Sequence, residues 1–222
     1  MQLLYRFRAW FWGWLAPHLP LHWRFAAKRA RLKQAWARWH RSGRPLPPPH
    51  EVKQLQLLNT QRQYGYKVLV ETGTFRGDMM IAMHPYFEKL YSIELSPELH
   101  QAALVRLRAY PKATLLQGDS GKVLANLTEA LAKPAIFWLD GHYSAGDTAL
   151  GDLETPIRAE LEAVLSHPIP HAVIIDDARL FNGSRDYPTL AQVESIVKDL
   201  NSEYRMHVCD DTIQILPPQI PR

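Results

Sequence analysis

Short apolar segments alternate with helical segments over residues 68–200, and this alternation restricts the chain to few folds. Strands that are this short and apolar on both faces predict a parallel sheet covered by helices on both sides. Near the end of the chain, Asp210 and Asp211 separate two further apolar segments, which predicts a closing antiparallel hairpin. We therefore expect an α/β fold with a doubly wound, mostly parallel, seven-stranded sheet.

The bounds of these elements follow from apolar periodicity and from turn residues. The expected strands are Val68–Val70, Lys89–Glu94, Ala113–Gln117, Ala135–Leu139, Ala172–Ile175, Tyr204–Val208 and Ile213–Leu216. The expected helices that accompany them are residues 51–64, 78–84, 97–110, 122–131, 154–166 and 190–200.

An acidic residue stands at or just after the end of each of the first five strands. These residues are Glu71, Glu94, Asp119, Asp140 and Asp176. In an open α/β sheet the carboxyl ends of the strands line one edge, which is where ligands bind. A single acid at such a position is often only a helix cap. Five in succession predict a binding edge.

The first strand passes directly into a turn that contains two glycines, residues 71–77 (ETGTFRG). Gly73 allows a sharp turn and a close approach to a ligand because it has no Cβ atom, and Gly77 allows close packing at the start of the next helix. The alternative is an ordinary strand-to-helix turn in which Glu71 caps the helix. The GxGxxG pattern of dinucleotide sites is not met, because three residues separate the two glycines, and a Walker phosphate-binding loop is absent.

The turn and the acids together resemble those of class I S-adenosylmethionine-dependent methyltransferases, over residues 66–217. The resemblance implies a Rossmann-like methyltransferase fold in which the turn borders the methionine part of the cofactor and Glu94 holds both ribose hydroxyls. The turn has fewer glycines than the usual form, although catechol-type O-methyltransferases share its E-x-G-x-x-x-G spacing. In the resemblance, Asp119 and Ser120 stand beside the adenine and Asp140 stands near the methyl donor. The full set of implied cofactor-binding residues is Glu71, Gly73, Thr74, Gly77, Glu94, Asp119, Ser120 and Asp140.

A second set of acids predicts a metal site. Asp176 and Asp177 are adjacent at a strand end, and Asp140 follows the neighbouring strand. Three carboxylates are a hard oxygen set suited to Mg²⁺, and the set resembles that of metal-dependent catechol-type and macrolide-sugar (macrocin-like) O-methyltransferases. The alternative is that Asp177 caps a helix and Asp176 only satisfies backbone groups.

Methyl transfer to a hydroxyl requires that its proton be made more acidic and removed, which a bound Mg²⁺ would assist. His142, two residues after Asp140, is the candidate general base because its ordinary pKa is near neutrality; the alternative is a solvated loop histidine. Tyr143 stands where catechol-type enzymes have a lysine and is a candidate contact to the substrate or the cofactor.

Residues 1–42 differ from the rest of the chain in composition and predict a basic helical arm. Residues 1–50 hold ten Lys and Arg and no Asp or Glu, whereas residues 51–222 hold sixteen against twenty-two. Indole rings prefer the headgroup region of a bilayer and cations are drawn to anionic lipid, so we expect two interfacial helices at residues 3–16 and 21–41. Six of the seven tryptophans lie in the arm: Trp10, Trp12, Trp14, Trp23, Trp36 and Trp39.

Two alternatives for the arm stay open. Its rings could cover the folded body or the partner in a homodimer, or it could bind nucleic acid, which the net negative charge of the body disfavours. Residues 43–50 (GRPLPPPH) predict a Pro-rich linker, and residues 51–222 are expected to form the methyltransferase domain.

We therefore expect a methyltransferase that uses S-adenosylmethionine and Mg²⁺ to methylate a hydroxyl of a sugar, glycan or natural-product-like metabolite. The alternatives are an RNA or protein methyltransferase that captures its substrate with the arm, and a catalytically silent cofactor-binding membrane adaptor. The single cysteine, Cys209, fits a reducing compartment, so we expect a cytoplasmic protein that is peripheral at the inner membrane face if the arm binds lipid.

Overall fold

The computed structural model describes residues 21–141 and 155–219. The strands in these ranges are β1 (Val68–Thr72), β2 (Lys89–Glu94), β3 (Ala113–Gln117), β4 (Ala135–Leu139), β5 (Ala172–Ile175), β6 (Arg205–Cys209) and β7 (Thr212–Leu216). The helices are α2 (Leu21–Arg41), α3 (His50–Tyr64), α4 (Asp78–Met83), α5 (Pro97–Leu107), α6 (Ser120–Glu129), α7 (Ile157–Leu165), the 3₁₀ turn η2 (Ala178–Leu180) and α8 (Leu190–Leu200).

Within these ranges the seven strands form one sheet in the order β3-β2-β1-β4-β5-β7-β6. Strands β1 to β5 run parallel, and β7 pairs antiparallel with both β5 and β6. The strands end level with one another, since Thr72 at the end of β1 pairs with Ile93 of β2 and with Leu139 of β4. The expected α/β fold, with a doubly wound and mostly parallel sheet closed by an antiparallel hairpin, is confirmed.

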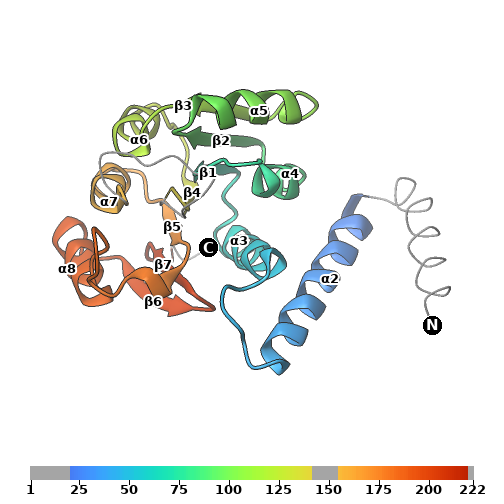
Figure 1. The fold of residues 1–222 in the computed structure, drawn as a ribbon, viewed down its shortest axis with the longest axis horizontal. Helices are drawn as coiled ribbons and strands as arrows, with labels where there is room; N and C mark the ends of the chain where they lie inside the picture. Colours follow the sequence, from blue (N-terminus) through green and yellow to red (C-terminus); the bar gives the residue numbers. More distant parts are fainter. Residues whose placement is uncertain (1–20, 142–154, 220–222) are drawn as a thin grey trace.

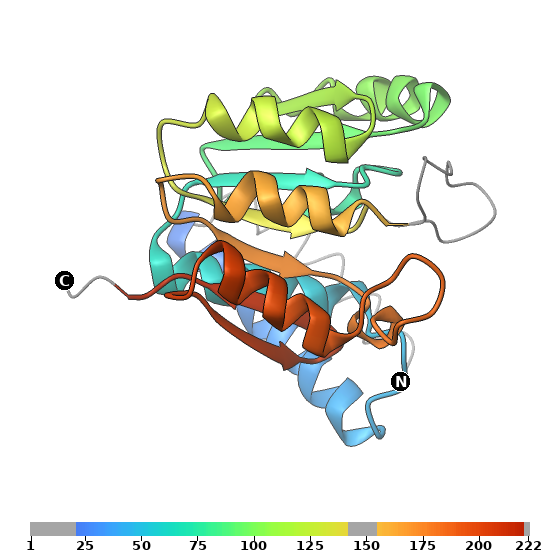
Figure 2. The ribbon, with the colours of Figure 1, turned by 90° about the vertical axis from the view of Figure 1, so that its left-hand side faces the viewer.

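Helices cover both faces of the sheet (Figures 1 and 2). Helices α6, α7 and α8 bury apolar side chains on one face, with Phe137 of β4 in that core. Helices α3, α4 and α5 pack on the other face, where Trp138 of the same strand is buried. Because β4 lies at the centre, all five of its residues are buried, which explains its uninterrupted apolar sequence.

Helix α2, the second half of the expected arm, packs on the outside of α3 (Figure 1). Leu32, Ala35 and Trp39 are buried. The Trp36 indole N–H donates to Asp210 Oδ2 over 2.7 Å, and the Trp39 indole N–H donates to the Pro45 carbonyl over 2.8 Å. Two of the arm's tryptophans therefore cover the folded body, as one of the open alternatives expects.

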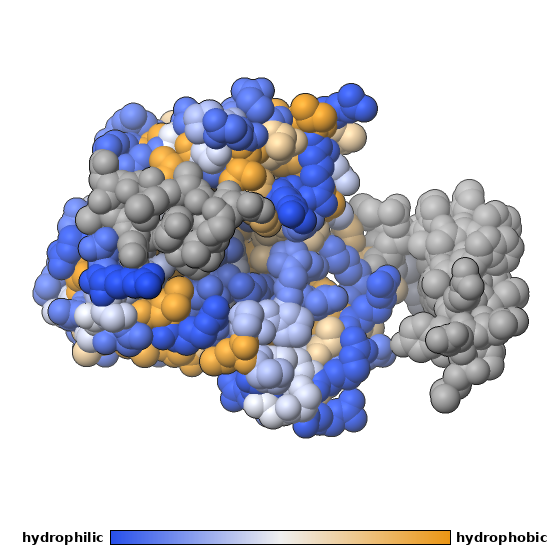
Figure 3. All heavy atoms as spheres, viewed as in Figure 1, coloured by the Kyte–Doolittle hydropathy of each residue, from blue (hydrophilic) through white to orange (hydrophobic). Residues whose placement is uncertain are grey.

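The other side of α2 is exposed and basic. Its exposed basic residues are Arg31, Lys33, Arg38 and Arg41. Hydrophilic residues dominate the surface around this helix on the side shown in Figure 3. Trp23, near the start of the helix, is 61% exposed. The helix expected at residues 3–16 lies outside the described residues. In the part of the chain that is described, no helix combines the length and the apolarity needed to cross a bilayer.

Candidate functional site

The turns that follow the parallel strands meet at one edge of the sheet (Figure 2). The backbone N–H of Asp140, after β4, donates to the Thr72 carbonyl of β1 over 3.1 Å, and that of Asp176, after β5, donates to the Leu139 carbonyl over 3.0 Å. Each turn is therefore tied to its neighbouring strand, and the acids predicted from the sequence come to this edge.

The turn after β1 approaches the turn after β4 so closely that only glycine fits. Gly73 has a φ of +81°, in the left-handed region, and a Cβ atom built on it would lie 2.4 Å from the Asp140 carbonyl oxygen. The Gly73 N–H donates to the Ile93 carbonyl of β2 over 3.0 Å. Gly77, with a φ of +72°, precedes α4 and faces the Leu107 side chain of α5, so it serves helix packing.

Gly73→Ala is expected to lower the free energy of unfolding by about 2–3 kcal/mol, because it adds steric overlap to left-handed backbone strain. Gly65→Ala is the matched control, since Gly65 has a φ of +72° with no atom within 4 Å of its added Cβ, and it should cost only the left-handed backbone strain of about 1 kcal/mol. Urea unfolding measures both values. Equal losses for the two variants would contradict the close approach at Gly73.

Glu94, at the end of β2, has a buried carboxylate that organises two turns. Its Oε2 accepts from the Phe75 backbone N–H over 2.8 Å, and its Oε1 accepts from the Ser96 N–H over 3.0 Å. Phe75 has a φ of +46° and is partly exposed. Glu94 thus holds the turn after β1 against the turn after its own strand.

Glu71 lies deeper than the sequence predicts. Its side chain is only 3% exposed. Its Oε2 accepts from Ser92 Oγ over 2.6 Å, and Ser92 Oγ in turn lies 2.7 Å from Thr74 Oγ1. Burial raises the pKa of Glu71 to about 8, with the charge of Asp140 acting in the same direction and the Ser92 hydrogen bond opposing it. The Glu71–Ser92–Thr74 chain therefore supports the turn from below, and Glu71 is protonated at neutral pH.

Asp119 and Ser120 begin helix α6 after β3. The Asp119 Oδ1 accepts from the Gly121 N–H over 2.9 Å, so Asp119 caps the helix, and Ser120 is buried. Beside them, the Gly141 N–H donates to Thr72 Oγ1 over 3.2 Å. A Cβ atom on Gly141 would lie 3.3 Å from Ser120 Oγ. The turns after β1, β3 and β4 are thus in contact.

Asp176 and Asp177, after β5, meet a lysine that the sequence analysis did not select. Lys53 of helix α3 donates from Nζ to Asp176 Oδ2, and the same nitrogen lies 3.5 Å from Asp177 Oδ1. The Asp176 side chain is 1% exposed and that of Lys53 is 16% exposed. Asp177 adopts a φ of +54° and its Oδ1 also accepts from the Arg179 guanidinium over 2.8 Å.

The electrostatics of this cluster keep Lys53 charged. Burial lowers the pKa of Lys53, but the charges of Asp176, Asp140 and Asp177 outweigh it and raise the pKa above its ordinary value. For Asp176, burial and the charge of Asp140 raise the pKa, against the opposing effect of Lys53. The Lys53 ammonium is therefore a counter-charge of Asp176, Asp140 and Asp177, and the Arg179 guanidinium is a second one for Asp177.

The predicted Mg²⁺ site is not supported by this arrangement. Across residues 21–141 and 155–219, no group of three or more His, Cys, Asp or Glu side chains is arranged to hold a metal ion. Asp176 and Asp177 instead face Lys53. The candidate base His142 and the candidate substrate contact Tyr143 lie outside the described residues, so both stay predictions.

The sequence does carry a signal for Lys53. Residues Gln54–Leu58 of α3 are all buried, and Lys53 shares a helix face with Leu57, four positions later. A lysine that directs its side chain toward a core needs an acidic partner there. The partner could not be identified from sequence, because α3 precedes every strand and its position on the sheet depends on tertiary packing.

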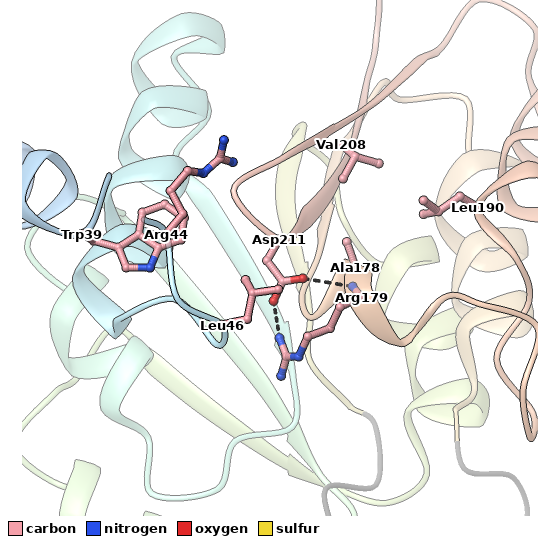
Figure 4. A pocket seen from close by; sticks show the side chains of 8 residues that line it. All are labelled: Trp39, Arg44, Leu46, Ala178, Arg179, Leu190, Val208 and Asp211. Carbon is pink, nitrogen blue, oxygen red and sulfur yellow. Dashed lines mark hydrogen bonds and ion pairs between the residues drawn. The ribbon is translucent and has the colours of Figure 1, made fainter. Parts of the chain in front are cut away.

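A pocket of about 380 Å³ lies beside η2, the turn that follows Asp177 (Figure 4). Side chains of the linker after α2, of η2 and of the β6–β7 hairpin surround it. Arg179 lines it, and donates its backbone N–H to Asp211 Oδ1 over 2.9 Å and its guanidinium to Asp211 Oδ2. The lining residues are Trp39, Arg44, Leu46, Ala178, Arg179, Leu190, Val208 and Asp211.

Comparison with known proteins finds likeness in structure and none in sequence. No protein family and no curated protein matches the chain. Among solved structures, a Podospora anserina methyltransferase bound to S-adenosylhomocysteine (SAH) matches with a TM-score of 0.52 and 14% identity, over 85% of this chain and 88% of that chain. A Bacillus cereus O-methyltransferase in complex with SAH matches with a TM-score of 0.52 and 15% identity, over 84% and 90%.

The O-methyltransferase TomG of Streptomyces achromogenes, involved in tomaymycin synthesis and solved with S-adenosylmethionine, matches with a TM-score of 0.51 and 17% identity, over 86% of this chain and 90% of that chain. All three identities are too low to carry a substrate or a residue role from one protein to the other. The strand order, the closing hairpin and these likenesses agree, and they show that the chain has the Rossmann-like fold of S-adenosylmethionine-dependent methyltransferases.

Proposed function

We propose that this protein is an S-adenosylmethionine-dependent methyltransferase that methylates a hydroxyl oxygen. The observation that carries the proposal is the buried Glu94 carboxylate at the end of β2, which joins the glycine turn after β1 to the turn after its own strand. The sheet that presents it has the fold of enzymes solved with SAH or S-adenosylmethionine bound. Open α/β sheets bind their ligands at this edge.

The residues at this edge fit a nucleoside with an amino-acid tail. Each oxygen of Glu94 accepts one backbone N–H, and a carboxylate oxygen has two lone pairs, so each retains an acceptor site for a ribose hydroxyl. Gly73 offers backbone without a Cβ atom, and Asp119 and Ser120 stand at the end of β3 for the base. S-adenosylmethionine, when bound, supplies a methyl group on a positively charged sulfur.

The acceptor in this proposal is a small hydroxyl compound such as a sugar, a glycan or a natural-product-like metabolite. The pocket beside η2 lies on the Asp177 side of the edge, and a volume of about 380 Å³ suits a small molecule. Its lining combines apolar Leu46, Leu190 and Val208 with the cationic residues Arg44, which pairs with Asp210, and Arg179, which pairs with Asp177 and Asp211. We further propose that His142 takes the hydroxyl proton, with Asp140 two residues before it in the chain and Tyr143 contacting the substrate.

The proposal is tested by calorimetric titration of the full chain with SAH, followed by transfer of labelled methyl groups from S-adenosylmethionine to extracts of sugars and other hydroxyl metabolites. We expect one saturable binding site and label in an extract whose transfer stops when its hydroxyls are acetylated. No heat with SAH, under conditions in which the protein is folded, would contradict the methyltransferase assignment. Label that appears only in RNA or protein would contradict the acceptor class.

We also propose that the basic arm attaches the protein to anionic membranes. The exposed arginines and lysines of α2 and the Trp23 side chain, which is 61% exposed, support it, because cations and indole rings favour an anionic lipid surface. Removing residues 1–42 would also remove Trp36 and Trp39, which pack on the body, so a shorter deletion is the better experiment.

In flotation with phosphatidylserine vesicles, we expect the full chain to float with the vesicles. A variant that lacks residues 1–20 and also carries Trp23→Ser should remain in the unbound bottom fraction. Raising the salt concentration should weaken flotation, because the attraction to anionic lipid is screened. Equal flotation of the two proteins would contradict the membrane role. Salt-dependent binding to RNA without binding to vesicles would favour the nucleic-acid interpretation.

A further inference from the structure

Lys53 reaches the acid-rich edge from outside the alternating strands and helices. Helix α3 precedes β1 in the chain, yet its Lys53 reaches the turn after β5, where it donates to Asp176. The ammonium also lies 3.5 Å from Asp177 Oδ1. A buried lysine is costly to desolvate, so this position indicates a specific requirement for a positive charge at the edge.

The carboxylates around Lys53 are already engaged in ways that suit an ammonium group. Asp176 uses Oδ2 for Lys53 and Oδ1 for the Asp177 backbone N–H, over 2.9 Å. Asp177 uses Oδ1 for Arg179 over 2.8 Å. Mg²⁺ requires near-octahedral oxygen ligands at about 2.1 Å from one point, and the ammonium would lie among those ligands. The described residues therefore do not fit a divalent ion here while Lys53 is in place.

We propose that the Lys53 ammonium takes the place of a divalent cation at this edge, and that it binds the acceptor oxygen in a methyl transfer that needs no metal. This inference rests on the proposed function. An ammonium has three N–H donors, and Asp176 takes one of them. A donor that remains can hold the acceptor hydroxyl oxygen, as a metal ion would, with a charge-assisted hydrogen bond.

The reaction balances without a metal. The acceptor oxygen forms its bond to the methyl carbon while the carbon–sulfur bond breaks, and the electron pair of that bond stays on sulfur, which becomes neutral. The hydroxyl proton leaves to the general base of the proposed function. Lys53 keeps all its protons and acts by holding the oxygen in line and by stabilising the negative charge that develops on it.

The inference is tested by titrating the full chain with Mn²⁺, followed by electron paramagnetic resonance of the free ion. We expect no specific binding of Mn²⁺ to the wild type. Lys53→Ala removes the ammonium from between the carboxylates, so its affinity for Mn²⁺ should be higher by on the order of tenfold or more. This gained site should disappear when Asp176→Asn is added. Lys67→Ala, an exposed lysine before β1, is the matched control and should behave as wild type.

Lys53→Gln answers the same question if Lys53→Ala does not fold, because glutamine can still donate to Asp176 without a charge. Stoichiometric Mn²⁺ binding by the wild type that Asp176→Asn abolishes would overturn the inference, and so would folded Lys53 variants that gain no Mn²⁺ site. SAH titration of the same samples tests the proposed function separately, since cofactor binding by Glu94 does not depend on which cation lies at Asp176. Methyl transfer by the wild type should be unchanged by EDTA.

Discussion

Glu94→Ala is expected to weaken SAH binding at least about 100-fold, which is the largest effect on binding that we predict. The carboxylate anchors two turns through the backbone N–H groups of Phe75 and Ser96, and it is the proposed acceptor for both ribose hydroxyls. Hydrogen bonds to a charged group contribute about 1.5–3 kcal/mol each, so the loss of two corresponds to 100-fold or more. Calorimetric titration with SAH measures the change.

Glu88→Ala is the matched control, because Glu88 is an exposed glutamate that immediately precedes the same strand at the opposite edge of the sheet. It should leave SAH affinity unchanged. Glu94→Gln keeps one acceptor oxygen, so its SAH affinity should lie between those of Glu94→Ala and Glu88→Ala, lower than that of the wild type by on the order of tenfold. Unchanged affinity in a folded Glu94→Ala protein would remove the main support for a cofactor site at this edge.

The largest effect on stability is expected from Glu71, whose buried carboxyl has its pKa raised to about 8. The folded state holds this proton more tightly than the unfolded state, where glutamate has its ordinary pKa of 4.5. The stabilisation from the bound proton is therefore complete below the unfolded pKa and is lost as the pH rises toward about 8. Between those two values the slope is about 1.4 kcal/mol per pH unit.

Glu71→Gln is neutral at every pH, so the free energy of unfolding of this variant should lack that slope. Urea unfolding of both proteins over this pH range gives the difference, which isolates Glu71 from other titrating groups. The free energy of unfolding of Glu71→Gln should increase steadily relative to that of the wild type as the pH rises. Glu88→Gln, at an exposed position, should show the same pH dependence as the wild type. Parallel curves for wild type and Glu71→Gln would show that Glu71 is already ionised in the folded protein.

Much of the fold could be predicted because its signals are local. Strands β2, β3, β4 and β5 have the expected bounds, since each is a short apolar run that ends at turn residues. Helix α6 begins at Ser120, two residues earlier than expected, because the Asp119 side chain caps it through Gly121. The five acids were recognised as a set, since parallel strands bring their carboxyl ends to one edge.

The roles of individual acids depend on tertiary contacts and were harder to predict. Glu71 and Glu94 both follow apolar strands, yet Glu71 lies beneath the turn with Ser92 while Glu94 holds two backbone N–H groups at the edge. Asp176 and Asp177 predict a metal site from sequence because carboxylates alone are visible there. The partner that Asp176 actually has, Lys53, lies more than a hundred residues earlier in the chain.

The position of Lys53 on α3 also bears on where the folding unit of this protein begins. A shortened chain that started at β1 would keep every strand of the sheet, but it would leave Asp176 without the ammonium that pairs with it and would expose the sheet face that α3 covers. Removing one partner of a buried ion pair is strongly destabilising, by about 3–5 kcal/mol. The smallest autonomous domain should therefore start at or before His50, and libraries of truncated chains screened for solubility should show a sharp boundary there.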